Sequence, residues 1–111
     1  MQRIRLECRS YGCYKFYETC MFQVGDASSI MLCARFGRIG TDGRALTKNV
    51  YENMTDAKYH WVDLAVRKER EGYVRVGSDE LIGVSPQDDI AVEQCLALFT
   101  QHRQQSATRS L

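Results

Sequence analysis

The sequence predicts an α+β fold: a twisted antiparallel β-sheet of four to five strands with a helix packed across one face, followed by a C-terminal helix. Two observations lead to this fold class. Residues 3–51 contain short runs in which apolar and polar residues alternate, the period of half-buried strands, with turn-forming residues between them. After residue 54 the apolar residues recur every three or four positions, which is the period of a helix.

Four runs before residue 52 have the composition of strands. They are residues 3–9, 15–24, 30–39 and 45–51. The first alternates strictly, with Ile4, Leu6 and Cys8 on one side and charged side chains on the other. Turn-forming residues at 25–29 and 40–43 separate the later runs, and both connections suit hairpins. We therefore expect four antiparallel strands in a meander.

A helix is predicted over residues 56–71. Its apolar stripe consists of Ala57, Trp61, Leu64 and Ala65, with Lys68 on the same face. Thr55 is the expected N-cap, and Gly72 is expected to end the helix. Because a large aromatic side chain in the middle of such a stripe packs against the sheet, we expect Trp61 to be buried. Residues 73–76 should form a final short strand, and residues 77–80 should begin a linker.

A second helix is predicted over residues 86–104, with Ser85 as its N-cap and Pro86 at its first position. Its apolar stripe consists of Val92, Cys95, Leu96 and Phe99. An isolated amphipathic helix of this length is marginal in water, so the stripe needs a partner. We expect that partner to be either the sheet face opposite the first helix or a second copy of the chain in a homodimer.

Length and composition indicate one domain followed by a tail. At 111 residues, 44% hydrophobic and 26% charged, the chain resembles an ordinary globular protein. We expect residues 1–76 to form the domain and residues 77–111 to form the linker, the second helix and a frayed end. No run approaches the roughly 20 apolar residues of a membrane span, and the polar start lacks the apolar core of a signal peptide. A cytoplasmic location without a membrane partner is the expectation.

The cysteines and histidines favour neither a metal site nor catalysis. The five cysteines are Cys8, Cys13, Cys20, Cys33 and Cys95. An odd number in a chain without an export signal predicts reduced, buried thiols and no disulfide. The sequence has no Cys-x-x-Cys pair, and His60 and His102 are remote from every cysteine, so we expect no metal and no cofactor. Cys20 or Cys33 as a nucleophile with His60 as its base has no supporting motif, which favours a binding module over an enzyme.

Charge is unevenly distributed along the chain, although the formal net charge is only +1. Residues 1–76 contain 13 Lys and Arg against 9 Asp and Glu, whereas residues 77–111 contain 2 against 5. The predicted domain is therefore basic and the C-terminal part acidic. A basic surface attracts polyanions such as nucleic acids.

A motif in the basic part carries a family resemblance. Residues 36–43 read FGRIGTDG, residues 15–17 read KFY, and the helix expected over residues 56–71 is followed by Gly72 and Tyr73. In this order and spacing the sequence resembles the WGR domain over about residues 3–76. Such domains end a long strand in an aromatic-Gly-Arg-(Ile/Val)-Gly-Thr segment, with a Phe-Tyr pair on the preceding strand. This sequence departs from the pattern at Phe36, where the family has tryptophan.

The resemblance implies a function in nucleic-acid binding. WGR domains occur in DNA-dependent poly(ADP-ribose) polymerases, where they contact the end of a broken strand, and also as free-standing bacterial proteins, which this chain resembles. By this resemblance, Phe36 corresponds to the aromatic residue that stacks on the terminal sugar. Arg38 corresponds to the arginine beside that aromatic residue. The expected nucleic-acid-binding residues are Lys15, Arg35, Phe36, Arg38, Arg44 and Lys48. Their partner would be DNA or RNA, bound through phosphates and strand ends.

Two alternatives stay open at this point. Phe36 and Arg38 share strand parity, so both point to one face unless a bulge at Gly37 separates them. Without a bulge, Phe36 could instead be a core residue and Arg38 a strand-end arginine paired with a carbonyl or an acid. The alternative function is a protein-protein interaction or dimerisation module that docks through a sheet edge or through the helix at 86–104.

Overall fold

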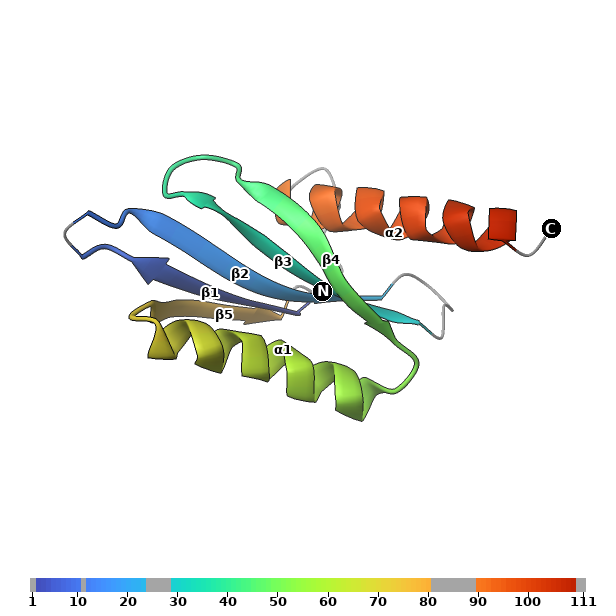
Figure 1. Ribbon diagram of the computed structural model, residues 1–111, viewed down its shortest axis with the longest axis horizontal. Helices are drawn as coiled ribbons and strands as arrows, with labels where there is room; N and C mark the ends of the chain where they lie inside the picture. Colours follow the sequence, from blue (N-terminus) through green and yellow to red (C-terminus); the bar gives the residue numbers. More distant parts are fainter. Residues whose placement is uncertain (1, 11, 24–28, 81–89, 110–111) are drawn as a thin grey trace.

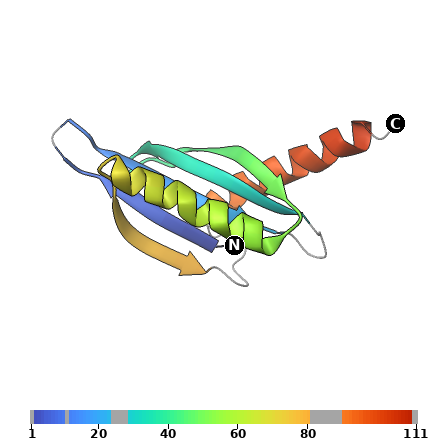
Figure 2. The same ribbon diagram turned by 60° about the horizontal axis from the view of Figure 1, so that its bottom comes forward.

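The computed structural model describes residues 2–10, 12–23, 29–80 and 90–109 and confirms the predicted fold class (Figure 1). Its elements, in chain order, are β1 (Gln2–Cys8), β2 (Lys15–Phe22), β3 (Ile30–Arg38), β4 (Arg44–Tyr51), α1 (Met54–Arg70), β5 (Val74–Glu80) and α2 (Ile90–Arg109). The five strands form one sheet in the order β4-β3-β2-β1-β5, and every neighbouring pair is antiparallel. The two helices lie on opposite faces of this twisted sheet (Figures 1 and 2).

The first four strands form the predicted meander, and the fifth strand is longer than expected. Residues 77–80 were expected to begin a linker, but they continue β5 and pair with β1, where Gln2 is opposite Glu80. Their sequence lacks alternation because an edge strand needs no apolar face along its whole length. β5 therefore closes the sheet beside the N-terminal strand.

Helix α1 starts two residues earlier than predicted because its N-cap is Asn53, not Thr55. The Oδ1 atom of Asn53 accepts hydrogen bonds from the backbone N–H groups of Thr55 at 2.7 Å and Asp56 at 3.4 Å. At the other end Gly72 has φ +103° and the N–H of Tyr73 donates to the carbonyl of Lys68. The glycine is required there because few other residues adopt this backbone conformation.

Trp61 connects α1 to the sheet through two hydrogen bonds and through the packing of its ring. Its Nε1 donates to the Thr19 carbonyl at 2.8 Å, and Thr19 Oγ1 donates to the Trp61 carbonyl at 3.1 Å. The ring packs against two clusters on this face. They consist of Ile4, Leu6, Tyr17, Ala34 and Ala65, and of Met21, Ile30 and Ala57. The sequence predicted a buried Trp61; in the structure it joins these clusters at their boundary and stays partly exposed.

Helix α2 packs on the sheet face opposite α1. This is the first of the two partners that the sequence left open. Its Val92, Cys95 and Phe99 contact a cluster formed by Cys20, Phe22, Met31 and Cys33. The predicted start at Ser85 and Pro86 lies outside the described residues, and the helix extends to Arg109, beyond the predicted end at residue 104. Within the described part of the chain, neither helix is long and apolar enough to cross a membrane.

Cys8 and Cys13 form a disulfide, so the prediction of no disulfide was wrong. Cys8 is the last residue of β1 and Cys13 lies in the turn that returns to β2, which brings their Cα atoms to 5.7 Å. That separation lies within the range for a disulfide. Cys20, Cys33 and Cys95 are buried, as predicted. The described residues contain no group of three or more His, Cys, Asp or Glu side chains that could hold a metal ion.

Candidate nucleic-acid interface

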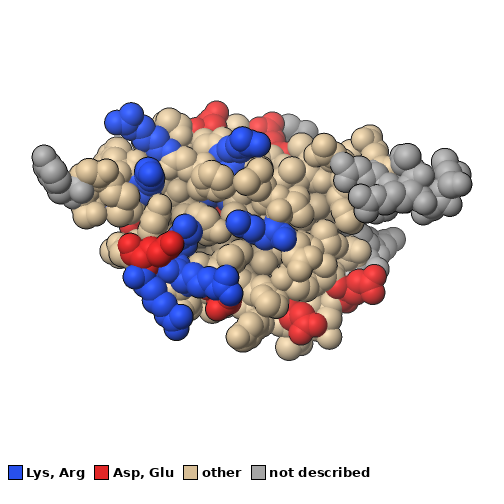
Figure 3. Space-filling model, viewed as in Figure 1, with Lys and Arg blue, Asp and Glu red and all other residues tan. Residues whose placement is uncertain are grey.

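A cavity of about 940 Å³ lies where the β1–β2 turn, the end of β3 and the C-terminal end of α1 meet. Its lining contains the cationic residues Arg9, Lys15, Arg38, Lys48 and Lys68 and the aromatic residues Tyr14, Phe16, Tyr17, Phe36 and Tyr73. Among the described residues that line it there is no Asp or Glu. Figure 3 shows Lys and Arg side chains gathered over the half of the molecule that contains these elements. The cavity is therefore both basic and aromatic.

Phe36 forms an open aromatic surface in this cavity. It pairs with Tyr17 across β2 and β3, and the two rings lie 6.4 Å apart with an interplanar angle of 14°. Tyr17 is 6% exposed, whereas Phe36 is 38% exposed. Burial raises the pKa of Tyr17 to about 12. The stacked pair thus has a fixed inner ring and an accessible outer ring.

The register explains how Phe36 and Arg38 share one face without conflict. Residues 15–17 pair continuously with residues 36–38, so β3 has no bulge at Gly37. Both side chains point to the α1 side, and the last turn of α1 lies over Tyr17, where Lys68 Nζ is 4.8 Å from the ring centroid. Phe36 is left partly open beside it, and Arg38 is exposed. The alternative in which Phe36 is a core residue therefore does not match the structure.

Gly37 and Gly43 bring two backbone segments together. A Cβ atom on Gly37 would lie 2.8 Å from the Cα of Gly43, and one on Gly43 would lie 2.7 Å from the carbonyl oxygen of Phe36. Gly43 also has φ +66°. The two glycines therefore pack the β3–β4 turn against the end of β3 and fix the position of Phe36.

Lys68 forms one wall of the cavity. Its Nζ lies 5.5 Å from the Tyr73 ring centroid, in addition to its contact with Tyr17, and forms a 3.0 Å ion pair with Glu71. Lys68 was predicted on the same helix face as the apolar stripe, and Tyr73 in the final strand, so neither was predicted as a site residue. The signal that could have identified them is the position of Lys68 one turn before Glu71, Gly72 and Tyr73, where the helix ends and its last side chains reach past the sheet.

Arg9 and Tyr14 complete the lining from the β1–β2 turn, and no motif in the sequence predicted either of them. Arg9 Nη1 donates to the Tyr14 hydroxyl at 3.3 Å, and the guanidinium carbon lies 5.3 Å from the Tyr14 ring centroid. Arg9 Nε also donates to Glu7 at 2.9 Å. Burial opposes ionisation of Glu7, but its hydrogen bonds from Arg9 and Arg5 hold the pKa of the carboxyl below its ordinary value.

The structure brings four of the six predicted site residues to this cavity. They are Lys15, Phe36, Arg38 and Lys48. Arg35 lies on the opposite face of the sheet, 7% exposed, where its Nη1 donates to Glu18 at 2.7 Å and its guanidinium carbon is 4.9 Å from the Phe16 ring centroid. Arg44 is exposed outside this cavity and lines a smaller one, of about 300 Å³, beside α2.

Comparison with known proteins identifies the family. The model of the WGR domain family matches residues 3–80, which run from β1 to the last residue of β5. No curated protein and no solved structure matches the chain. The matched segment covers more than half of the sequence and contains the five-stranded sheet, α1 and all the described residues that line the cavity. The chain belongs to the WGR domain family.

Proposed function

We propose that this protein is a nucleic-acid-binding module that holds the end of a strand in the basic and aromatic cavity. WGR domains are nucleic-acid-binding modules, and the family supports this class of ligand. The observation that carries the proposal is the cavity itself, in which a half-exposed ring lies among five cations. Phosphates require cations, and a terminal nucleotide offers a free sugar and base face that an aromatic ring can stack on.

The placement of the cations supports contact with consecutive phosphates. Arg38 and Lys15 are opposite each other on β3 and β2, and Lys48 approaches from β4. The planar guanidinium of Arg38 can bind two phosphate oxygens at once, whereas Lys15 and Lys48 act as point charges. Phe36 and Arg38 lie two residues apart on the same face of β3, so one nucleotide can place its phosphate on the arginine and its sugar or base on the ring.

The surroundings of Phe36 support a strand end over the interior of a duplex. The cavity is bounded by the β1–β2 turn on one side and by the end of α1, with Lys68 and Tyr73, on another. A ring within such walls is accessible to a terminal nucleotide, whose outer face is free, but not to a base pair stacked on both sides. The proposal assigns a binding role to these residues and no catalytic step.

The test is a titration of labelled single strands, blunt duplexes and 5′-phosphorylated duplexes at two salt concentrations. If about four phosphates are neutralised, the affinity should fall with salt at a log-log slope of about −3 to −4, and less steeply for single strands. Lys48→Glu should weaken binding strongly. Lys58→Glu is the matched control, because Lys58 is an exposed lysine near the other end of α1.

Binding that is absent at low ionic strength for all three ligands would reject this function and favour a protein-interaction module. The structure offers one surface for that second candidate. Val74 and Val76 are 65% and 52% exposed on β5, an edge strand. Helix α2 is less suited to the role, because its Val92, Cys95 and Phe99 already pack against the sheet. A concentration-dependent change in molecular mass would support dimerisation through the β5 edge.

A further inference from the structure

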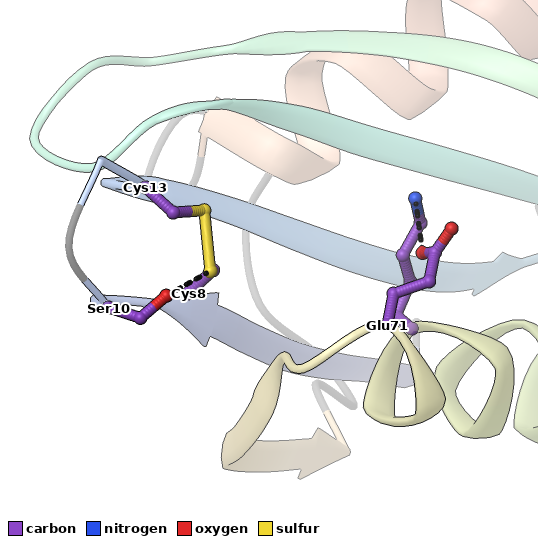
Figure 4. The surroundings of a disulfide bond; sticks show 5 residues. Cys8, Ser10, Cys13 and Glu71 are labelled. Carbon is purple, nitrogen blue, oxygen red and sulfur yellow. Dashed lines mark hydrogen bonds and ion pairs between the residues drawn. A yellow bond between two sulfur atoms is a disulfide. The ribbon is translucent and has the colours of Figure 1, made fainter.

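The Cys8–Cys13 disulfide lies in the wall of the candidate site (Figure 4). It connects the end of β1 to the turn that leads into β2, on the side of the sheet where Glu71 caps the C-terminal end of α1 (Figure 4). Cys13 lines the cavity itself, and so do its neighbours Arg9 and Tyr14. The bond therefore fixes the backbone that carries a cation and an aromatic ring of the site.

We propose that Cys8 and Cys13 form a reversible redox site, which exchanges with small thiols and disulfides and sets the affinity of the cavity for nucleic acid. In the oxidised state the bond holds the β1–β2 turn in its binding form, and in the reduced state the turn is released. This regulation rests on the proposed function, because it acts on the same cavity.

The bond acts on the turn and not on the sheet. β1 and β2 pair continuously from Gln2 opposite Met21 to Cys8 opposite Lys15, so the ladder holds both strands without help from the disulfide. The bond closes a loop between residues only five positions apart, and short loops contribute least to global stability. Beyond the ladder, the turn has a backbone hydrogen bond from Cys13 to Ser10 at 2.8 Å.

Accessibility and a neighbouring hydroxyl favour exchange at this bond. Cys8 is 7% exposed, whereas Cys13 is more accessible, so an incoming thiolate attacks the Cys13 sulfur. The S–S bond breaks, the electron pair leaves on the Cys8 sulfur, and the proton of the small thiol ends there. Ser10 Oγ lies 3.4 Å from Cys8 Sγ and can donate a hydrogen bond to the departing thiolate.

A second small thiol completes the reduction. Its thiolate attacks the mixed disulfide on Cys13, which releases the Cys13 thiol and a small-molecule disulfide. The protein thus gains two electrons and two protons, and two small thiols are oxidised to one disulfide. A small-molecule disulfide drives the same steps in reverse. A thiol-rich environment therefore releases the turn and lowers the affinity for nucleic acid. An oxidising environment restores the disulfide and the binding form of the turn.

The other three cysteines do not compete in this exchange. Cys20, Cys33 and Cys95 are buried between the sheet and α2. A hydrogen bond to Cys95, together with burial, raises the pKa values of the Cys20 and Cys33 thiols. Thiolates are the reactive species, so these buried thiols react slowly. Redox chemistry is therefore selective for the Cys8–Cys13 pair.

The first experiment needs no nucleic acid. The full chain is equilibrated with oxidised glutathione or with dithiothreitol, its intact mass is measured, and amide hydrogen exchange is compared between the two states. Reduction should speed exchange of the Cys13 and Ile39 amides, which bond to the Ser10 and Tyr14 carbonyls, by about tenfold or more, and leave β2 and β3 unchanged. Equal exchange at both amides in the two states would overturn the proposal.

The second experiment measures the affinity of both states for a labelled single strand. The reduced protein should bind about three- to tenfold more weakly, because the strand then has to order Arg9 and Tyr14. A Cys8→Ser, Cys13→Ser variant should bind like the reduced protein and ignore the redox buffer, with unchanged exchange of the sheet amides as proof of folding. Ser10→Ala should slow the reduction.

The outcomes separate this inference from the proposed function. If neither redox state binds nucleic acid, the proposed function fails, and the exchange of the Cys13 and Ile39 amides alone decides whether the pair controls the turn. If both states bind with equal affinity, the redox control is overturned and the function stands. A redox effect on affinity that persists in the double serine variant would also overturn it, because it would then arise from the buried cysteines.

Discussion

Arg35 and Arg38 lie three residues apart on β3 and have opposite environments. Arg35 points to the α2 side, where it is bound to Glu18 and stacked on Phe16. Arg38 points to the α1 side and is exposed at the edge of the basic and aromatic cavity. Both looked like nucleic-acid ligands in the sequence. The difference shows that strand parity decides which arginine supports the fold and which one faces the solvent.

The largest effect should follow from removal of the buried arginine. Arg35→Ala leaves Glu18, which is 2% exposed, without its closest cation, although Arg5 Nη1 still donates to it at 3.1 Å. The loss should therefore be about 3 to 4 kcal/mol, the lower part of the range for a broken buried ion pair. Urea unfolding measures this loss. Arg38→Ala is the matched control, because an exposed side chain changes stability by less than about 0.5 kcal/mol. Equal losses for the two variants would remove the distinction between the two faces.

Trp61 lies against the part of the sheet face that α1 covers, next to the exposed part around Phe36. Trp61→Ala should cost about 3 kcal/mol, the low end for a large aromatic, since its ring is partly exposed. Trp61→Phe keeps most of the ring but loses the hydrogen bond to Thr19, for about 1 kcal/mol. Thermal or urea unfolding of both variants measures these values. A Trp61→Ala variant as stable as the wild type would contradict the packing described here.

Phe36 should matter for binding more than for stability. Phe36→Ala should weaken binding to strand ends by about 1 to 3 kcal/mol, the value of a base stacked on an aromatic ring. Binding to a duplex interior should change less, because only an end presents a free face. Phe36→Trp, which restores the aromatic residue of the family motif, should keep the affinity. Fluorescence titrations with capped and open ends measure the contrast, and equal losses on both ligands would argue against end recognition.

Arg38 should act on every nucleic acid alike. Arg38→Ala removes a phosphate contact, so it should weaken all ligands to a similar extent and reduce the salt slope by about 1. Arg35→Lys is the informative comparison, because it keeps a charge in the buried position and should leave the salt slope unchanged. An Arg38 variant with an unaltered slope would mean that this arginine does not contact phosphate.

The smallest effect concerns Tyr17, the buried member of the stacked pair. Its pKa is raised from 10.0 to about 12, so the folded state holds the phenolic proton more tightly than the unfolded state does. The resulting stabilisation is complete below pH 10 and is lost as the pH rises through 12. Ultraviolet absorbance should therefore show one late-titrating tyrosine that is missing in Tyr17→Phe. A Tyr17 that ionises with the exposed tyrosines would show that its ring is more open than described.

Most of the fold could be predicted because periodicity reports directly on burial. The four-stranded meander and α1 follow from apolar spacing, and the structure confirms them. For α2 the spacing left two packing partners open, and the structure shows that the sheet is the one. The end of β5 could not be predicted, since its pairing with β1 depends on a distant strand and not on its own composition. Asn53 was missed as the N-cap because Asn53 and Thr55 are both capping residues, and only backbone geometry distinguishes them.

The candidate site could be predicted only in part. The motif identified Phe36 and Arg38, but Arg35 was grouped with them although its opposite strand parity places it on the other face of the sheet. Arg9 and Tyr14 belong to the site because of a turn that carries no motif. The disulfide was missed because the absence of an export signal predicts reduced thiols, whereas the turn that brings Cys8 close to Cys13 has no sequence motif.

The strand order has a consequence for how the chain is made. β1 is synthesised first, yet one of its neighbours in the sheet, β5, ends at Glu80. Chain synthesis proceeds at about 5 to 20 residues per second, so the edge of β1 that pairs with β5 stays unpaired for on the order of ten seconds. A bare edge invites pairing with other chains, and charged side chains discourage it. Arg3, Arg5 and Glu7, which alternate along β1, place such charges on the strand that waits longest.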